Sequence, residues 1–116
     1  AVIESVIAHL IRLGYVNDGA FARQWALSRI RLRGFGRRRI EQELRGKGVS
    51  RDIILEVLSE AFQEPSEADI ARREAEKKRK SLSRFAPEVQ RRRLAGFLER
   101  RGFSAGIIRS IVNSVK

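Results

Sequence analysis

Residues 40–58 read IEQELRGKGVSRDIILEVL and decide the fold. Ile40 and Leu44 have the spacing of one helix face, and Gly46 or Gly48 follows where a left-handed residue commonly ends a helix. Ser50 is then a suitable N-cap, and apolar residues return at helical spacing from Ile53 onward. The stretch therefore predicts two amphipathic helices joined by a tight glycine turn.

The same pattern occurs three times along the chain. Gly14, Gly48 and Gly102 each follow a leucine by four residues and another aliphatic residue by eight. A cap residue and a second apolar face come after each glycine. The three copies lie 34 and then 54 residues apart, which is typical of helical repeats that pack against their neighbours. We therefore predict an all-α fold, in which tandem three-helix, helix-turn-helix-like units form an elongated, curved molecule.

Glycines and caps also place the helices outside this stretch. We expect a first helix that ends at Gly14 and a second that starts at Asn17 or Asp18 and ends near Gly34. No segment shows the two-residue period of a strand. The three predicted repeats, the second of which includes a long polar helix, span residues 1–35, 36–84 and 85–116.

Polar caps and a proline predict the later helices. Ser66, with Asp69 three residues on, has the pattern of a capping box and opens the long polar helix. Pro87 suits the first position of the next helix, and Ser104 is expected to cap the last. These signals bring the expected number of helices to seven.

The charge of the chain is strongly positive and unevenly distributed. Lys and Arg number 25 against 14 Asp and Glu, a net charge of +11. Residues 29–51 hold nine basic and two acidic groups, residues 52–71 hold six acidic groups and no basic one, and residues 72–101 hold twelve basic and four acidic groups. Such a field attracts polyanions. A basic but otherwise ordinary surface is the alternative.

The two basic blocks supply the candidate residues for binding a nucleoprotein. The candidates are Arg29, Arg31, Arg33, Arg37, Arg38, Arg39, Arg45, Lys47, Arg73, Lys77, Lys80, Arg84, Arg91, Arg92, Arg93, Arg100 and Arg101. Arg73, Lys77, Lys80 and Arg84 have the spacing of one face of the long helix. Phe35 is the aromatic side chain singled out for base stacking, because it lies between two glycines inside a basic block.

Several classes of protein are excluded or disfavoured. The chain has no Cys, which excludes disulfides and thiolate metal sites, and His9 is its only histidine. With no Walker loop and no paired acid and base, we expect no enzyme, no cofactor and no metal. No apolar run reaches the ~20 residues of a membrane span, and we expect a cytoplasmic monomer. Because the chain begins with Ala1 and has no Met, we expect a fragment or a processed chain whose N-terminal part is missing.

An ordered set of short motifs resembles the RecX family of bacterial regulatory proteins. The set comprises Gly14-Tyr15-Val16-Asn17-Asp18, Phe21-Ala22-Arg23, Arg31-Leu32-Arg33-Gly34-Phe35-Gly36, Ile40, Glu43-Leu44, Lys47-Gly48-Val49 and Arg100-Arg101-Gly102-Phe103-Ser104. The resemblance spans nearly the whole chain. It implies an elongated molecule of tandem three-helix units.

The resemblance also implies a function in DNA repair, recombination and the SOS response. Members of the family modulate, and usually inhibit, the RecA recombinase. They are thought to lie in the groove of the RecA–DNA filament and to restrain ATP hydrolysis, strand exchange and co-protease activity. The partners implied are the RecA filament and single- and double-stranded DNA.

Two other functions stay open from the residues alone. A stand-alone DNA-binding protein of the helix-turn-helix type would bind duplex DNA without RecA, although no clear recognition helix aims Asn, Gln or Arg at bases. A helical scaffold for an acidic protein would need no nucleic acid. The response of DNA binding to salt, with and without RecA filaments, separates the three.

Overall fold

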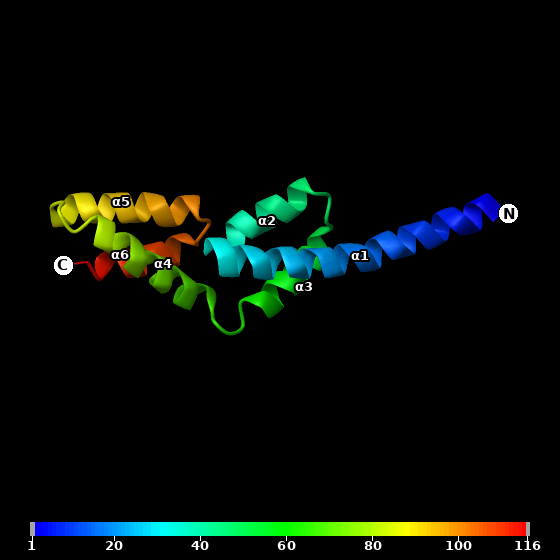
Figure 1. Ribbon diagram of the computed structural model, residues 1–116, viewed down its shortest axis with the longest axis horizontal. Helices are drawn as coiled ribbons and strands as arrows, with labels where there is room; N and C mark the ends of the chain where they lie inside the picture. Colours follow the sequence, from blue (N-terminus) through cyan, green and yellow to red (C-terminus); the bar gives the residue numbers. More distant parts are fainter. Residues whose placement is uncertain (1, 116) are drawn as a thin grey trace.

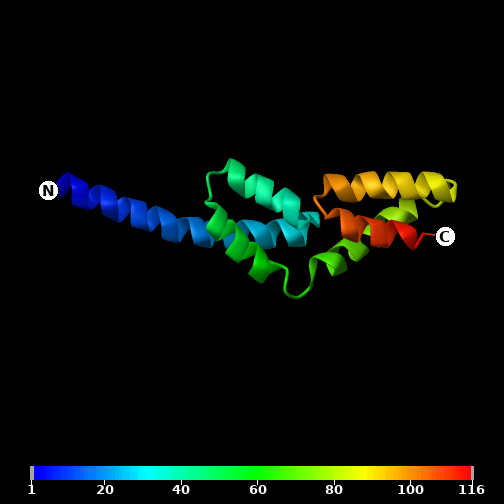
Figure 2. The same ribbon diagram turned by 180° about the vertical axis from the view of Figure 1, so that it is seen from behind.

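The computed structural model describes the backbone of residues 2–115 and the side chains of residues 18–115. Over this part of the chain it contains six α-helices and no strand. The helices are α1 (Val2–Arg33), α2 (Arg37–Gly46), α3 (Arg51–Ala61), α4 (Glu67–Ser81), α5 (Pro87–Arg100) and α6 (Ala105–Asn113). The molecule is elongated, with extents of 70 × 23 × 22 Å, and the start of α1 extends beyond the other helices (Figures 1 and 2).

The first helix is longer than expected. The predicted break between Gly14 and Asp18 is wrong, because α1 runs without interruption from Val2 to Arg33. A glycine inside a helix costs only about 1 kcal/mol relative to alanine, and α1 contains no proline to remove a helical hydrogen bond. The helix therefore passes through Gly14, and the side chain of His9 lies outside the described residues.

The other predicted helix ends are largely confirmed. Gly48 and Gly102 have φ angles of +84° and +90°, as the glycine turns require. The Ser50 hydroxyl accepts a hydrogen bond from the backbone N–H of Ile53, and Pro87 is the first residue of α5. Ser104 takes the N-cap position of α6 without a side-chain hydrogen bond.

The long polar helix begins as predicted but ends early. The reciprocal hydrogen bonds of a capping box join Ser66 and Asp69 at the start of α4. The helix ends at Ser81, so Arg84 lies in the following turn and the predicted four-residue basic face is wrong at its last member. Leu82, at the C-cap position of α4, is buried.

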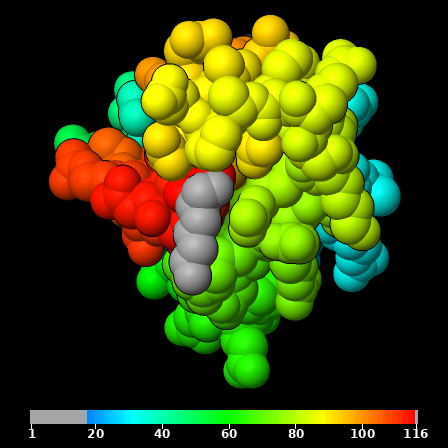
Figure 3. All heavy atoms as spheres, turned by 90° about the vertical axis from the view of Figure 1, so that its left-hand side faces the viewer, coloured from blue at the N-terminus to red at the C-terminus, as the bar shows by residue number. Residues whose placement is uncertain are grey.

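The helices pack as two three-helix units in tandem. α1, α2 and α3 contact one another, and α4, α5 and α6 contact one another. Seen from the end of the second unit, the start of α5 lies above α6 and the end of α4 (Figure 3). The side chains with less than 2% exposure include Ile40, Leu44, Ile54 and Leu58 in the first unit and Leu94, Leu98 and Phe103 in the second. The tandem all-α fold is thus confirmed, while the boundaries after residues 35 and 84 stay a prediction.

Candidate functional site

The two units meet where the segment 34–36 crosses the end of α5. The backbone N–H of Gly36 donates to the carbonyl of Arg101 at 2.7 Å, and the N–H of Arg38 donates to the carbonyl of Gly102 at 3.0 Å. A Cβ atom on Gly36 would lie 2.6 Å from the carbonyl oxygen of Gly102. Only a residue without a side chain allows the two backbones to approach this closely.

Phe35 fills the centre of this junction. Its side chain is 8% exposed, and the guanidinium carbons of Arg39, Arg29 and Arg101 lie 4.5, 5.9 and 6.0 Å from its ring centroid. Cations within about 6 Å of an aromatic centroid are attracted by the ring. Phe35 is therefore occupied by arginines of both units, and this argues against the predicted role in base stacking.

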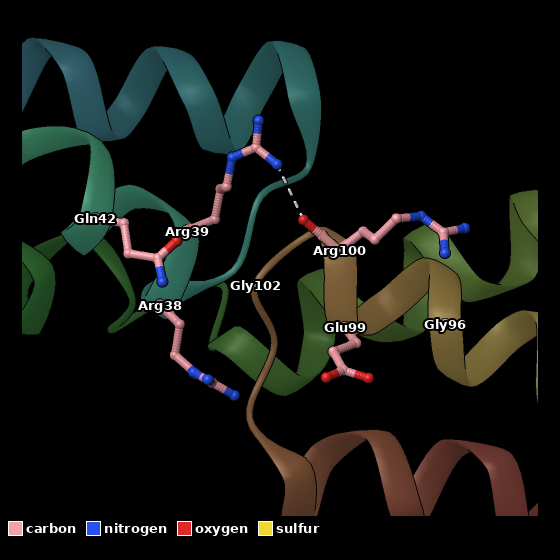
Figure 4. A pocket seen from close by; sticks show the side chains of 7 residues that line it. All are labelled: Arg38, Arg39, Gln42, Gly96, Glu99, Arg100 and Gly102. Carbon is pink, nitrogen blue, oxygen red and sulfur yellow. Dashed lines mark hydrogen bonds between the residues drawn. The ribbon is translucent and has the colours of Figure 1, made fainter. Parts of the chain in front are cut away.

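Two of these arginines also connect the units by hydrogen bonds. Arg101 Nη1 donates to Glu74 Oε1 at 2.9 Å and also to the carbonyl of Arg33. Arg39 Nη1 donates to the carbonyl of Arg100 at 3.1 Å, as the dashed line in Figure 4 shows. The Glu74 side chain is only 14% exposed, so its contact with Arg101 is partly shielded from water. These arginines hold the units together, so part of each guanidinium is unavailable to an external partner.

Other candidate residues are engaged within the first unit. Trp25 Nε1 donates to Glu43 Oε1 at 3.0 Å, and Arg29 Nε lies 3.4 Å from the same carboxylate oxygen. Lys47 Nζ lies 4.3 Å from the Trp25 ring centroid. Arg45 forms an ion pair of 2.9 Å with a glutamate one turn earlier in α2. The cluster around Trp25 packs α1 against α2.

Three candidates lie at the far end of the second unit. Arg91 Nη1 donates to the carbonyl of Val115 at 3.2 Å. The guanidinium carbons of Arg93 and Arg84 lie 4.3 and 4.9 Å from the ring centroid of Phe85. These contacts join the start of α5 to the preceding turn and to the end of the chain, away from the junction.

Eight candidates have no side-chain partner among the residues that the structure describes. They are Arg31, Arg33, Arg37, Arg38, Arg73, Lys80, Arg92 and Arg100. Lys77 is only weakly engaged, because its Nζ is 3.4 Å from Glu74 Oε2 while its side chain is 77% exposed. The eight are spread over both units and are the cations most available to an external anion.

Two free arginines border a groove between α2 and α5. The groove has a volume of ≈ 490 Å³ and is lined by Arg38 and Arg100 together with Arg39, Gln42 and Glu99 (Figure 4). Guanidinium groups bind phosphate or carboxylate in two-pronged geometry. Sequence reasoning missed Gln42 and Glu99, because the groove exists only where the two units meet.

No described helix combines the length and the apolar character needed to cross a membrane. Within the same residues, no cluster of three or more His, Cys, Asp or Glu side chains is placed to hold a metal ion.

Comparison with known proteins places this fold in a family. The family model of the RecX second three-helix domain matches residues 17–58, and that of the third matches residues 66–112. The chain belongs to the RecX family. It is 39% identical over 115 residues to the regulatory protein RecX of Myxococcus xanthus and to that of Thermobifida fusca. These alignments cover 97% and 96% of this chain, and the chain spans 61% and 60% of those relatives.

A solved RecX structure has the same fold. The crystal structure of RecX from Lactobacillus salivarius superposes with a TM-score of 0.80, over 97% of this chain and 73% of that chain, at 23% sequence identity. RecX relatives carry the name of regulatory proteins, and this agrees with the regulatory family that the sequence motifs resemble. Phe35 and Gly36, at the end of the Arg31–Gly36 motif of that resemblance, lie at the junction between the units.

Proposed function

We propose that the chain modulates a RecA recombinase, as an inhibitor, by binding in the groove of the RecA–DNA filament. It would restrain ATP hydrolysis, strand exchange and co-protease activity, and act as a cytoplasmic monomer without catalysis of its own. Membership of the RecX family supports the regulatory role. The proposed mode of binding rests on the junction. It joins the two units, each of which has free arginines, into one elongated body.

The charge distribution supports a nucleoprotein partner. A filament repeats its phosphates and protein surfaces along an axis, and an elongated body with separated cations contacts several of them at once. The exposed face of α3, by contrast, carries Asp52, Glu56 and Glu60. These carboxylates suit a basic protein surface better than DNA phosphates.

The same face argues against the alternative of a stand-alone helix-turn-helix protein. In that motif the last helix enters the major groove with donors aimed at bases. In the first unit this helix is α3, and its acidic side chains would repel the phosphates on both sides of the groove. Specific duplex binding by the first unit without RecA is therefore the weaker proposal.

The test is inhibition of RecA ATP hydrolysis on single-stranded DNA. We expect the triple variant Arg38→Glu, Arg92→Glu and Arg100→Glu to lose inhibition, because it reverses free cations of both units and leaves the junction contacts of Arg39 and Arg101 in place. Arg51→Glu, a single charge reversal, is the control, because Arg51 is exposed on α3 and has no side-chain partner among the described residues. Equal inhibition by the triple variant and the control would overturn the proposal.

A salt titration identifies the partner of these arginines. If three phosphate contacts are removed, the dependence of log affinity on log salt should fall by about 2 units for single-stranded DNA. We expect that fall with RecA filaments present and weaker binding to DNA alone. Binding of equal strength with and without RecA would favour the stand-alone DNA-binding protein.

A further inference from the structure

A second groove lies between α1, α3 and α4 and shares no lining residue with the groove of Figure 4. It has a volume of ≈ 330 Å³. Its lining combines aliphatic groups of Leu27, Ile30 and Ala61 with basic groups of Arg31, Arg73 and Lys77. The aliphatic and basic residues come from both three-helix units, so the groove depends on the junction that fixes one unit against the other.

One aliphatic side chain of this groove, that of Leu27, is exposed. Leu27 is 46% exposed, whereas the neighbouring Ala26 is fully buried. Ile30 and Ala61 are partly buried against the core. Exposed aliphatic surface inside a concave site loses its contact with water when a ligand covers it, and such sites commonly bind apolar groups.

The charge of the groove is predominantly positive. Arg31 and Arg73 are exposed and have no side-chain partner among the described residues. Glu64 and Glu74 also line the groove, but the Glu74 carboxylate already accepts a hydrogen bond from Arg101 at 2.9 Å. Lys77 Nζ also lies 3.4 Å from Glu74 Oε2, so two free guanidiniums remain against one carboxylate, that of Glu64, that is not engaged.

We propose that this groove binds an extended acidic segment of a partner protein, with an aliphatic side chain against Leu27 and carboxylates on Arg31 and Arg73. Guanidinium groups bind carboxylates through paired hydrogen bonds. A nucleic acid fits less well, because none of the lining residues is aromatic and bases would have no ring on which to stack. The proposal is independent of the proposed function, since it requires neither RecA nor DNA.

The test uses a labelled synthetic peptide in which glutamate alternates with leucine. Binding is followed by fluorescence anisotropy, and backbone amide shifts of the whole ¹⁵N-labelled chain locate the site. We expect shifts clustered at Leu27, Arg31, Ala61 and Arg73. The double variant Arg31→Glu and Arg73→Glu should weaken binding at least ~10-fold, and Leu27→Ser several-fold. Arg51→Glu, again the control, should bind as the unmodified chain does.

Three further probes separate the contribution of charge from that of the apolar contact. A peptide with serine in place of leucine should bind more weakly, and a peptide with lysine in place of glutamate should not bind. Oligothymidylate of equal charge should leave the amides of the groove unshifted. The proposal is overturned if oligothymidylate binds this groove as tightly as the peptide, or if the peptide shifts map to the groove between α2 and α5.

Discussion

Gly48 and Gly102 have the same left-handed backbone but different surroundings. Their φ angles are +84° and +90°. A Cβ atom on Gly48 would meet nothing within 4 Å, whereas one on Gly102 would lie 2.3 Å from the backbone nitrogen of Arg39. Repeating spacing alone predicts the backbone conformation of both glycines. The spacing does not predict the close contact of Gly102 with Arg39, because Arg39 belongs to the other unit.

The two glycines therefore give a matched pair of substitutions. We expect Gly48→Ala to lower the free energy of unfolding by about 1–3 kcal/mol, the cost of a left-handed conformation for a residue with a side chain. Gly102→Ala should cost more, because its methyl group also pushes the two units apart. Chemical denaturation of both variants measures the difference. Equal losses would show that the close contact with Arg39 contributes nothing.

At the scale of elements, most helix ends follow from local chemistry. The caps at Ser50 and Ser66 and the proline at position 87 are local signals, and each lies where its helix begins. The continuity of α1 was missed for a different reason. A glycine is compatible with both a helix end and a helix interior, and only the difference in free energy of the whole chain selects between them.

The start of α4 should be sensitive to acid. The hydrogen bond from Arg72 is the main cause that holds the pKa of Asp69 below its usual value of 3.8, and the backbone N–H and hydroxyl of Ser66 add to the effect. Because the pKa is lowered on folding, the carboxylate stabilises the fold above the unfolded-state pKa, and this contribution is lost as the pH falls through the folded-state value. The contribution of Asp69 to stability should therefore be lost below about pH 4.

Thermal unfolding as a function of pH checks this expectation. Between about pH 5 and pH 3, the melting temperature of the unmodified chain should fall more than that of Asp69→Asn, which has no carboxyl group to protonate. At neutral pH, the variant should be the less stable of the two, because an amide replaces a charge-assisted acceptor at a helix N-terminus. If the two curves of melting temperature against pH are parallel, the Asp69 carboxylate does not contribute to the loss of stability in acid.

At the scale of the molecule, the sequence predicts the units but not how they are joined. Helical periodicity predicts the buried faces, and the recurring glycine turns indicate a tandem array. Which arginines bind an external anion depends on which carboxylates lie nearby in space. Arg101 and Arg100 are adjacent in sequence, yet the Arg101 side chain bonds to Glu74 whereas that of Arg100 lines a groove. Charge counts cannot separate them.

Substitution of Arg101 tests whether side-chain contacts at the junction hold the two units in a fixed arrangement. Arg101→Met keeps an unbranched chain but removes the hydrogen bonds to Glu74 and to the carbonyl of Arg33. We expect both units to stay folded and the motion between them to increase. The chain has no native Cys, so spin labels on cysteines introduced at Ser59 and Ser83, one in each unit, measure the distance between the units without interference.

The distance distribution should broaden in Arg101→Met and stay narrow in Arg93→Met, whose guanidinium contacts Phe85 within the second unit. Both variants remove one positive charge, so a difference between them reflects the junction and not the net charge. If the proposed function is correct, Arg101→Met should also weaken inhibition of RecA ATP hydrolysis, because two loosely joined units lose the gain from binding as one body. A narrow distribution with full inhibition would mean that backbone contacts between Gly36 and Arg101 suffice to join the units.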